Sequence, residues 1–336
     1  MDAGNAMETV EMGIILGGVG IATMVVVSYL VFIWWLDRYE REPIWLVLLT
    51  FLWGALIGTC LGCVLSIPGM LLSVGLFGAE MGGLISAVVV APLVEEFTKG
   101  LVFVLLLFTR HIDNETDGLI YGAATGLGFA TLENLAYFVG AAEGGMEVFL
   151  GIVTVRTLFT ALVHCISSAL LGMFIGYARH RSGQLRWLIY PGIGFGLAVL
   201  NHGLWNLLAT LSGFDGSNTE GLLFLLLGMA MVVGLSVMMF ALTQLSLKRE
   251  HDVIRRFLLK EAEKGTLPRA HAEIIPYWSR RRKKGWLDPK ISQNAYIQAA
   301  TLLAFRHYQM EIAEGERSEQ YLKDIERYRH EVQAQL

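Results

Sequence analysis

Long apolar stretches separated by short polar connections make up the chain as far as residue 247. A helix needs about 20 mostly apolar residues to cross a hydrocarbon core about 30 Å thick. Seven stretches are long enough, at residues 13–36, 44–67, 83–108, 118–140, 149–178, 187–209 and 222–247. The pattern therefore predicts an all-α, polytopic membrane helix bundle with about seven transmembrane helices.

The pattern changes near residue 247, which divides the chain into a predicted membrane core, 1–246, and a polar tail, 247–336. The core carries 8 Lys and Arg against 17 Asp and Glu, whereas the tail carries 18 against 13. Apolar residues such as Ile254, Phe257 and Leu258 recur in the tail at helical spacing. We therefore expect a basic, helical tail on the cytoplasmic side.

A run of basic residues at 280–284 lies between Trp278 and Trp286 in this tail. Such a cluster attracts anionic lipid headgroups at a membrane surface. A solvated helix face explains the same residues equally well. Contact between the tail and anionic lipid is thus one of two open interpretations.

Lys and Arg residues outside the apolar stretches are confined to alternate connections. Residues 1–12, 68–82, 141–148 and 210–221 contain none, and the other connections hold Arg38, Arg41, Arg110, Arg179, Arg181, Arg186 and the basic tail. Lys and Arg accumulate on the cytoplasmic side of a membrane. The distribution predicts a multi-pass plasma-membrane protein with its N-terminus outside and its C-terminus in the cytoplasm.

The composition agrees with a lipid bilayer as the environment. Hydrophobic residues make up 54% of the chain and charged residues 17%, against about 25% charged residues in soluble domains. The core has no basic excess, so nucleic acid is not an expected partner. The three cysteines lie in apolar stretches and predict no disulfide framework.

Ionisable residues inside the predicted spans are the first candidates for function. A charged group near the bilayer centre costs about 2.5–3.5 kcal/mol on insertion scales. The chain has seven ionisable residues in such positions, which are Glu95, Glu96, Lys99, Glu133, Arg156, His164 and His202. Polar residues recur at intervals of four within a span, as in Glu95 and Lys99 and in the series Arg156, Thr160, His164 and Ser168, and so share a helix face. Because lipid would not tolerate these stripes, we expect them to meet at one buried site.

The depth of this site follows from the helical rise of about 1.5 Å per residue. Counted from the outer ends of their spans, Glu133, Arg156 and His202 lie about 10–12 Å deep. We therefore expect the site in the outer to middle part of the membrane, open to water and substrate from the extracytoplasmic side.

Two backbone features accompany the polar stripes. Pro92 lies three residues before Glu95 and predicts a kink in that span. Gly118, Gly122 and Gly126 form a ladder of small residues, which predicts close packing of their span against a neighbouring helix.

Four motifs in order on four successive spans carry a family resemblance. They are Glu95-Glu96-Phe97-Thr98-Lys99, then Phe129-Ala130-Thr131-Leu132-Glu133-Asn134, then His164, and last His202-Gly203-Leu204-Trp205-Asn206. In these motifs the chain resembles the PrsW family of intramembrane proteases, which is related to the CAAX prenyl endopeptidases. The CAAX branch typically has FxxxH as its second motif, whereas this chain has FxxxE followed by Asn134. The resemblance implies hydrolysis of peptide bonds in membrane-anchored proteins such as anti-sigma factors, and not prenyl-protein processing.

Peptide hydrolysis needs a base for water, donors for the oxyanion and a proton for the leaving amine. We assign the base to Glu95, with Glu96 helping to hold the water or the proton. His164 and His202 are candidates for stabilising the oxyanion or protonating the amine, and the amide of Asn206 is a further donor. In supporting positions, Lys99 and Arg156 balance charge beside Glu133 and Asn134.

No cofactor is expected, although zinc is an open alternative. His164, His202 and Glu95 come from separate spans and together have the donor types that zinc prefers. Against zinc, the chain lacks HExxH, and Lys99 and Arg156 would repel a divalent cation. We therefore favour glutamate chemistry without a metal.

A proton-coupled transporter or channel is the alternative function, because buried Glu, His and Arg chains also form proton relays. The apolar stretches show no inverted repeat of the kind that many transporters contain. We therefore prefer the protease, whose partners would be a membrane-anchored protein substrate and the lipid bilayer.

Overall fold

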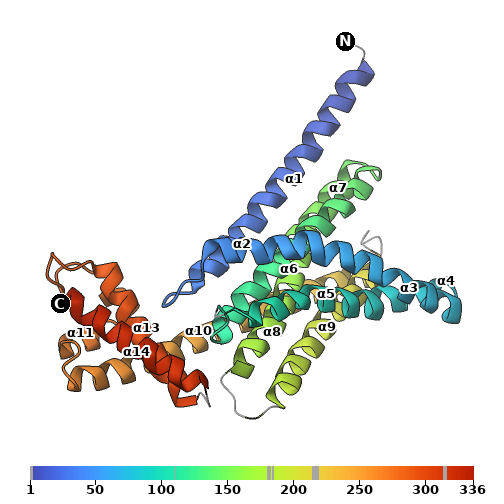
Figure 1. Cartoon of the computed structure of the whole chain (residues 1–336). Helices are drawn as coiled ribbons and strands as arrows, with labels where there is room; N and C mark the ends of the chain where they lie inside the picture. The colour runs from blue at the N-terminus through green and yellow to red at the C-terminus, as the bar shows by residue number, and fades with distance from the viewer. Residues whose placement is uncertain (1–2, 110, 180–182, 184, 214–218, 313–315) are drawn as a thin grey trace. The chain divides into compact units, whose positions relative to one another are not determined.

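The computed structural model describes residues 3–109, 111–179, 183, 185–213, 219–312 and 316–336 (Figure 1). All regular structure in this described part of the chain is helical, which confirms the all-α prediction. Arg110 and Arg181, which contribute to the predicted topology, lie outside the described residues.

The first four helical stretches carry the predicted spans up to residue 142. They are α1 (Ala3–Leu36), the continuous stretch α2 (Ile44–Leu52), η1 (Trp53–Gly58) and α3 (Thr59–Phe77), the stretch α4 (Ala79–Ile85), η2 (Ser86–Val90) and α5 (Ala91–Leu107), and α6 (Glu115–Ala142). The symbol η marks a π-helical segment, in which one extra residue widens the turn.

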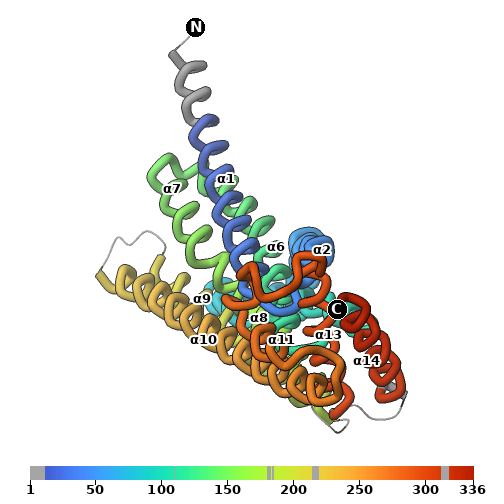
Figure 2. Tube along the Cα trace, turned by 90° about the vertical axis from the view of Figure 1, so that its left-hand side faces the viewer, coloured from blue at the N-terminus to red at the C-terminus, as the bar shows by residue number. Residues whose placement is uncertain are grey.

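The remaining helices carry the later spans and the tail. They are the continuous stretch α7 (Met146–Val155), η3 (Arg156–Thr160) and α8 (Ala161–Arg179), then α9 (Arg186–Ser212), α10 (Thr219–Glu263), α11 (Arg269–Ile274), α12 (Trp278–Arg281), α13 (Gln293–Ile312) and α14 (Glu316–Gln335). The long course of α10 is clearest in Figure 2.

Four helical stretches of the described chain are long and apolar enough to cross a membrane. They are Met12–Leu36, Ile44–Phe77, Met146–Arg179 and Thr219–Glu263. The expected number of about seven spans is therefore not confirmed. The other three expected spans contain ionisable residues. Stretch 79–107 contains Glu95, Glu96 and Lys99, stretch 115–142 contains Glu133, and stretch 186–212 contains His202. These ionisable groups make the three stretches less apolar than the other four.

The chain forms two compact units. Unit 1 comprises Met1–Trp34, Glu42–Arg179 and Gln184–Phe240, and unit 2 comprises Trp35–Arg41, His180–Gly183 and Ala241–Leu336. The connection between α1 and α2 thus belongs to the same unit as the polar tail.

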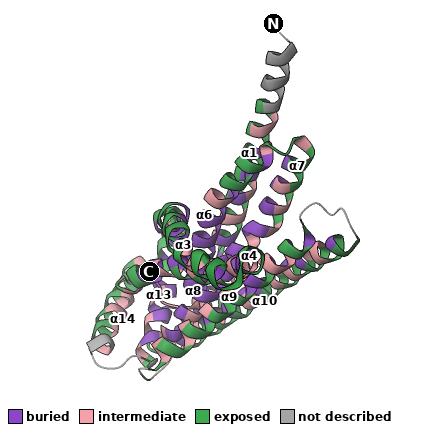
Figure 3. Cartoon of the chain, turned by 90° about the vertical axis from the view of Figure 1, so that its right-hand side faces the viewer, coloured by how far each residue is buried: buried purple, intermediate pink, exposed green. Residues whose placement is uncertain are grey.

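The centre of unit 1 is the pair α6 and α8. Their residues are mostly buried, as Figure 3 shows, whereas many large apolar side chains of α2, α3 and α9 are exposed. A Cβ atom added at Gly118, Gly122 or Gly126 of α6 would collide with a backbone carbonyl of α8. The predicted close packing of this glycine ladder is confirmed, and it brings the backbone of α6 against the carbonyl of His164.

Unit 2 has a hydrophobic core of its own. Ile254, Phe257 and Leu258 of α10 pack with residues of α13 and α14, including the buried Tyr296 and Val332. The helical periodicity of the tail therefore reflects a packed core rather than an isolated amphipathic helix.

Candidate active site

Segments from α5, α6, η3, α8 and α9 bring the seven predicted ionisable residues together in unit 1. Glu96, Lys99, Arg156, His164 and His202 are all buried. The side chains of Glu95 and Glu133 retain 13% and 22% exposure. These two carboxylates are therefore the acidic groups of the cluster that another molecule can reach most easily.

Lys99 lies at the centre of the cluster. Its Nζ lies 2.5 Å from Oε1 of Glu96 and 3.0 Å from Nδ1 of His164. It also lies 4.3 Å from the ring centroid of Phe129, the first residue of the second motif. Lys99 thus forms an ion pair with Glu96, three residues earlier on the same helix. This ion pair agrees with the charge-balancing role expected for Lys99.

The hydrogen-bond partners of His164 determine where its ring proton lies. An ammonium group can only donate, so Nδ1 of His164 accepts the hydrogen bond from Lys99. The proton of the neutral ring is then on Nε2, which lies 2.8 Å from Oε2 of Glu133. His164 therefore donates to Glu133 through this nitrogen.

Glu133 is held on its other side by Arg156. Nη2 of Arg156 donates to Oε2 of Glu133 over 2.7 Å, and its Nε donates to Oδ1 of Asn134 over 2.8 Å. Asn134 in turn donates to the carbonyl of Arg156, and the guanidinium lies over the ring of Tyr137. One arginine thus links η3 to both Glu133 and Asn134, the glutamate of the FxxxE motif and the asparagine that follows it.

His202 connects the two adjacent glutamates. Its Nδ1 lies 2.9 Å from Oε1 of Glu96, and its Nε2 lies 3.8 Å from Oε2 of Glu95. The same oxygen of Glu95 is buried and has no hydrogen-bond partner among the described residues. If Nδ1 donates to Glu96, both atoms that face each other across this gap are acceptors. The gap is therefore suited to a donor such as water.

Glu95, His164 and His202 also form a possible metal site. Each offers one ligand atom, and the three atoms lie within 4.8 Å of one another. His202 is oriented as metal-binding histidines usually are, with its other nitrogen against a carboxylate. His164 is not, because its Nδ1 faces the ammonium of Lys99 and its Nε2 carries a proton. In this hydrogen-bond pattern Nε2 of His164 carries a proton, so a metal would bind all three residues only if that proton left and His164 gave up its contact with Glu133.

Asn206 is placed differently from the other predicted catalytic residues. Its Nδ2 donates to the carbonyl of Ala87 in η2 over 2.9 Å. Gly203 lies against the carbonyl of Val88, where an added Cβ would come within 2.5 Å of the oxygen. The motif of α9 therefore supports the π segment that precedes Glu95, in the stretch where Pro92 breaks the α-helical hydrogen-bond ladder.

Three π segments are the feature that sequence reasoning missed. η2 precedes Glu95, η3 begins at Arg156, and η1 includes Gly54, which packs against the backbone of α6. Segments of this kind are frequent at functional sites. Pro92 is the one local signal for η2, and the residues of η1 and η3 have no pattern that distinguishes them from an α-helix.

Two further polar contacts join the cluster to α8. Ser168 donates to Oε2 of Glu96 over 3.3 Å, and Nδ2 of Asn201 donates to Oγ of Ser167 over 2.7 Å. Both serines bond neighbouring helices, as expected for hydroxyl groups in a membrane span. Asn201 was missed, although its polarity beside His202 in an apolar span is a usable signal.

Comparison with known proteins shows a similarity to proteases. Residues 42–242 match the family model described as "PrsW family intramembrane metalloprotease". The chain is 30% identical over 179 residues to the Protease PrsW of Bacillus subtilis (strain 168), covering 52% of this chain and 74% of that protein. It is 31% identical over 176 residues to the Protease PrsW of Geobacillus kaustophilus (strain HTA426), covering 52% and 72%. No solved structure matches the chain.

Proposed function

The chain belongs to the PrsW family of intramembrane proteases, and from this premise we propose that it cleaves single-span membrane proteins with Glu95 as the base. The observation that carries this proposal is the unpartnered Oε2 of Glu95, which faces Nε2 of His202 at 3.8 Å. The alternative of a proton-coupled transporter has no support from the relatives.

The proposed reaction uses one water molecule per peptide bond. Glu95 removes a proton from the water while the oxygen forms a bond with the scissile carbonyl carbon, and the carbonyl π electrons move to the oxygen. When the carbon–nitrogen bond breaks, the proton held by Glu95 passes to the leaving amine. The new carboxyl group loses its remaining proton to the released amine or to water, so the products are a carboxylate end and an amine end, and the glutamate returns to its starting state.

His202 and Glu96 position the water in this scheme. Glu96 is buried between Lys99 and His202 and accepts hydrogen bonds from both. A carboxylate held in this way fixes the orientation of the imidazole, as second partners of active-site histidines do. Nε2 of His202 is then directed at the gap beside Glu95, where it accepts a hydrogen bond from one O–H of the water while Glu95 accepts a hydrogen bond from the other.

His164 and Glu133 form the opposite wall of the site. Their contact places a polarised N–H beside the partly exposed carboxylate of Glu133, and Arg156 balances the charge of that carboxylate. When a substrate carbonyl enters, the Nε2–H group of His164 stops donating to Glu133 and donates a hydrogen bond to the developing oxyanion instead. Asn206 acts as a positioning residue in this proposal, because its amide holds η2 and so the start of α5.

We also propose that the reaction needs no metal, although the matching family model is described as an intramembrane metalloprotease. The objection that Lys99 and Arg156 would repel a cation is weakened, because each is paired with a glutamate. The hydrogen bonds of His164 carry the argument instead, since both of its ring nitrogens are occupied. Metal dependence is therefore a direct test of the proposed hydrogen-bond pattern.

The proposed substrate approaches from the extracytoplasmic side. The basis is the predicted orientation, which places Glu133, Arg156 and His202 about 10–12 Å from the outer edge. A helical substrate must unwind there, because a regular helix covers its carbonyls with internal hydrogen bonds. We expect cuts in the outer juxtamembrane segment or the outer part of the substrate's span.

The test is a cleavage assay with the full-length protein in proteoliposomes and single-span substrates of known orientation. Mass spectrometry of the two fragments identifies the bond that is cut. The proposal predicts cuts near the outer face that depend on Glu95. Cuts confined to the cytoplasmic half would contradict the entry side, and an absence of cleavage across substrates would contradict the proposed reaction.

A further inference from the structure

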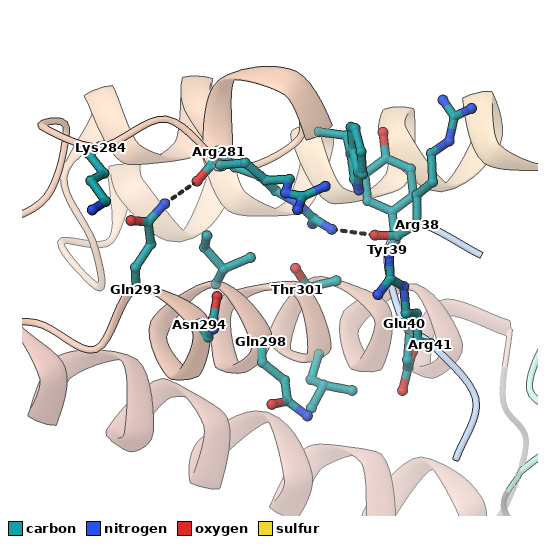
Figure 4. A pocket seen from close by; sticks show the side chains of 14 residues that line it. Arg38, Tyr39, Glu40, Arg41, Arg281, Lys284, Gln293, Asn294, Gln298 and Thr301 are labelled. Atoms are coloured by element: carbon teal, nitrogen blue, oxygen red, sulfur yellow. Dashed lines mark hydrogen bonds between the residues drawn. The ribbon is translucent and has the colours of Figure 1, made fainter. Parts of the chain in front are cut away.

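A pocket of about 590 Å³ lies within unit 2, and no residue of the glutamate and histidine cluster lines it (Figure 4). Three segments enclose it, which are the connection 38–41, the segment 278–284 at α12, and the first turns of α13. Its charged lining comprises five cations, Arg38, Arg41, Arg281, Arg282 and Lys284, and one carboxylate, Glu40. The pocket is therefore strongly basic.

Arg281 is the most buried of these cations, with 6% exposure. Its Nη2 donates to the carbonyl of Arg38 over 2.5 Å, which ties α12 to the connection between α1 and α2. Its Nη1 is buried and has no hydrogen-bond partner among the described residues. A buried donor without an acceptor costs about 1–3 kcal/mol, so this atom indicates that an acceptor binds here.

Two more pocket residues have buried polar atoms without a partner. They are Nε of Arg38 and Oγ1 of Thr301, and neither atom has a hydrogen-bond partner among the described residues. Unsatisfied buried groups are rare in native proteins. With Nη1 of Arg281, three residues of one pocket lining have an unsatisfied buried polar atom, which favours a ligand rich in hydrogen-bond acceptors.

The electrostatics of Arg281 point to an anion. Burial lowers the pKa of its guanidinium, the nearby Tyr39 and Asp37 oppose this, and Arg41 and Arg282 lower the pKa further. Arg282 also lies over the ring of Trp278, which fixes this wall of the pocket. A bound anion would offset the repulsion among the arginines.

We propose that this pocket binds a phosphate-bearing anion. Arginine matches phosphate because its planar N–H groups reach two oxygens at once. The volume exceeds what a bare phosphate needs and leaves room for a small attached group such as glycerol. Both a phospholipid headgroup and a soluble phosphate ester have this chemistry, and Arg38 and Arg41 directly follow the long apolar helix α1. The site is independent of the proposed proteolysis.

The experiment measures ligand binding by the full-length protein with two probes. Calorimetry follows glycerol 1-phosphate in solution, and native mass spectrometry counts phosphatidylglycerol retained from mixed nanodiscs with phosphatidylcholine. The test variant is Arg282→Gln/Lys284→Gln, which removes two exposed cations of the pocket. The matched control is Arg280→Gln/Lys283→Gln, which removes two cations of the same run that do not line it.

The pocket predicts that the test variant weakens binding about tenfold or more, whereas the control changes it little. Thr301→Val, which removes one buried hydroxyl and no charge, should weaken binding as well. If this pattern appears with glycerol 1-phosphate the ligand is soluble, and if it appears with phosphatidylglycerol alone the ligand is a lipid. Equal weakening by both double variants would show attraction to the basic run only and would overturn the pocket, as would a failure of both probes to bind.

Discussion

Oε2 of Glu95 and Nε2 of His202 face each other at 3.8 Å inside the helix bundle, and the glutamate oxygen has no other partner among the described residues. Every other carboxylate of the cluster has an ion-pair partner, Lys99 for Glu96 and Arg156 for Glu133. Two acceptors at this distance favour a bridging donor, and water is both that donor and the second substrate of hydrolysis. The predictions below follow from this relationship and from the packing that creates it.

Glu95→Gln should reduce the rate of substrate cleavage by about 10²-fold or more, because the amide keeps the shape of the side chain but cannot accept the proton. The rate is measured in proteoliposomes from the initial appearance of the cleaved fragment. Glu80→Gln makes the same change of charge at an exposed position of α4 and should be neutral. A folded Glu95→Gln protein that cleaves at the wild-type rate would refute the assignment.

Chelators should leave the cleavage rate unchanged, because both nitrogens of His164 are occupied by Lys99 and Glu133. Removal of a catalytic metal would instead cost orders of magnitude in rate. The measurement compares dialysed protein with and without a zinc chelator and determines bound metal by mass spectrometry. Inactivation that zinc reverses would show that His164 releases one of its partners to a metal.

Glu133→Gln should lower the free energy of unfolding by about 3–5 kcal/mol, because it leaves the charge of Arg156 buried without its partner. The double variant Glu133→Gln/Arg156→Met removes both charges and should recover much of this loss. Thermal unfolding in one detergent is compared for the wild type, the single variants Glu133→Gln and Arg156→Met, and the double variant. Additive losses in the double variant would mean that the ion pair, 2.7 Å long in the structure, contributes nothing by itself.

Gly122→Ala should destabilise the protein by about 1–3 kcal/mol or more, because the added methyl group would collide with the carbonyl of Ser168. Gly140→Ala is the matched control on the same helix, since nothing lies within 4 Å of the position of its added Cβ. Thermal unfolding and cleavage rate are measured for both. Equal effects would contradict the tight contact between α6 and α8.

The predicted orientation places Glu143 outside and Lys323 in the cytoplasm. Both positions are exposed, so a cysteine introduced at either should be accessible from its own side. In a background without Cys60, Cys63 and Cys165, an impermeant thiol reagent should label Glu143→Cys in intact cells and Lys323→Cys only after lysis. The reverse labelling pattern would reverse the topology and the proposed side of substrate entry.

The sequence by itself determined the helical class and which ionisable residues the helices bring together. Apolar stretches of membrane length allow few structures other than helices, because lipid cannot satisfy exposed backbone groups. The high cost of ionisable groups in such stretches identified Glu95, Glu133, His164 and His202, and the interval of four residues predicted that they share an interior. The glycine ladder of α6 was also readable, because close helix contact requires small residues.

Only the tertiary structure decided which groups of the site are partners. Lys99 is compatible by spacing with both Glu95 and Glu96, and the structure pairs it with Glu96. Asn206 shares the polar stripe of His202, yet its amide donates to the carbonyl of Ala87. The partner of each side chain depends on how far its helix is rotated about its own axis, by a fraction of a turn. The π segments and the contacts between helices set this rotation, and no local sequence pattern predicts it. The basic pocket is the extreme case, because Arg38, Arg281 and Thr301 are far apart in the chain and meet only through the folding of unit 2.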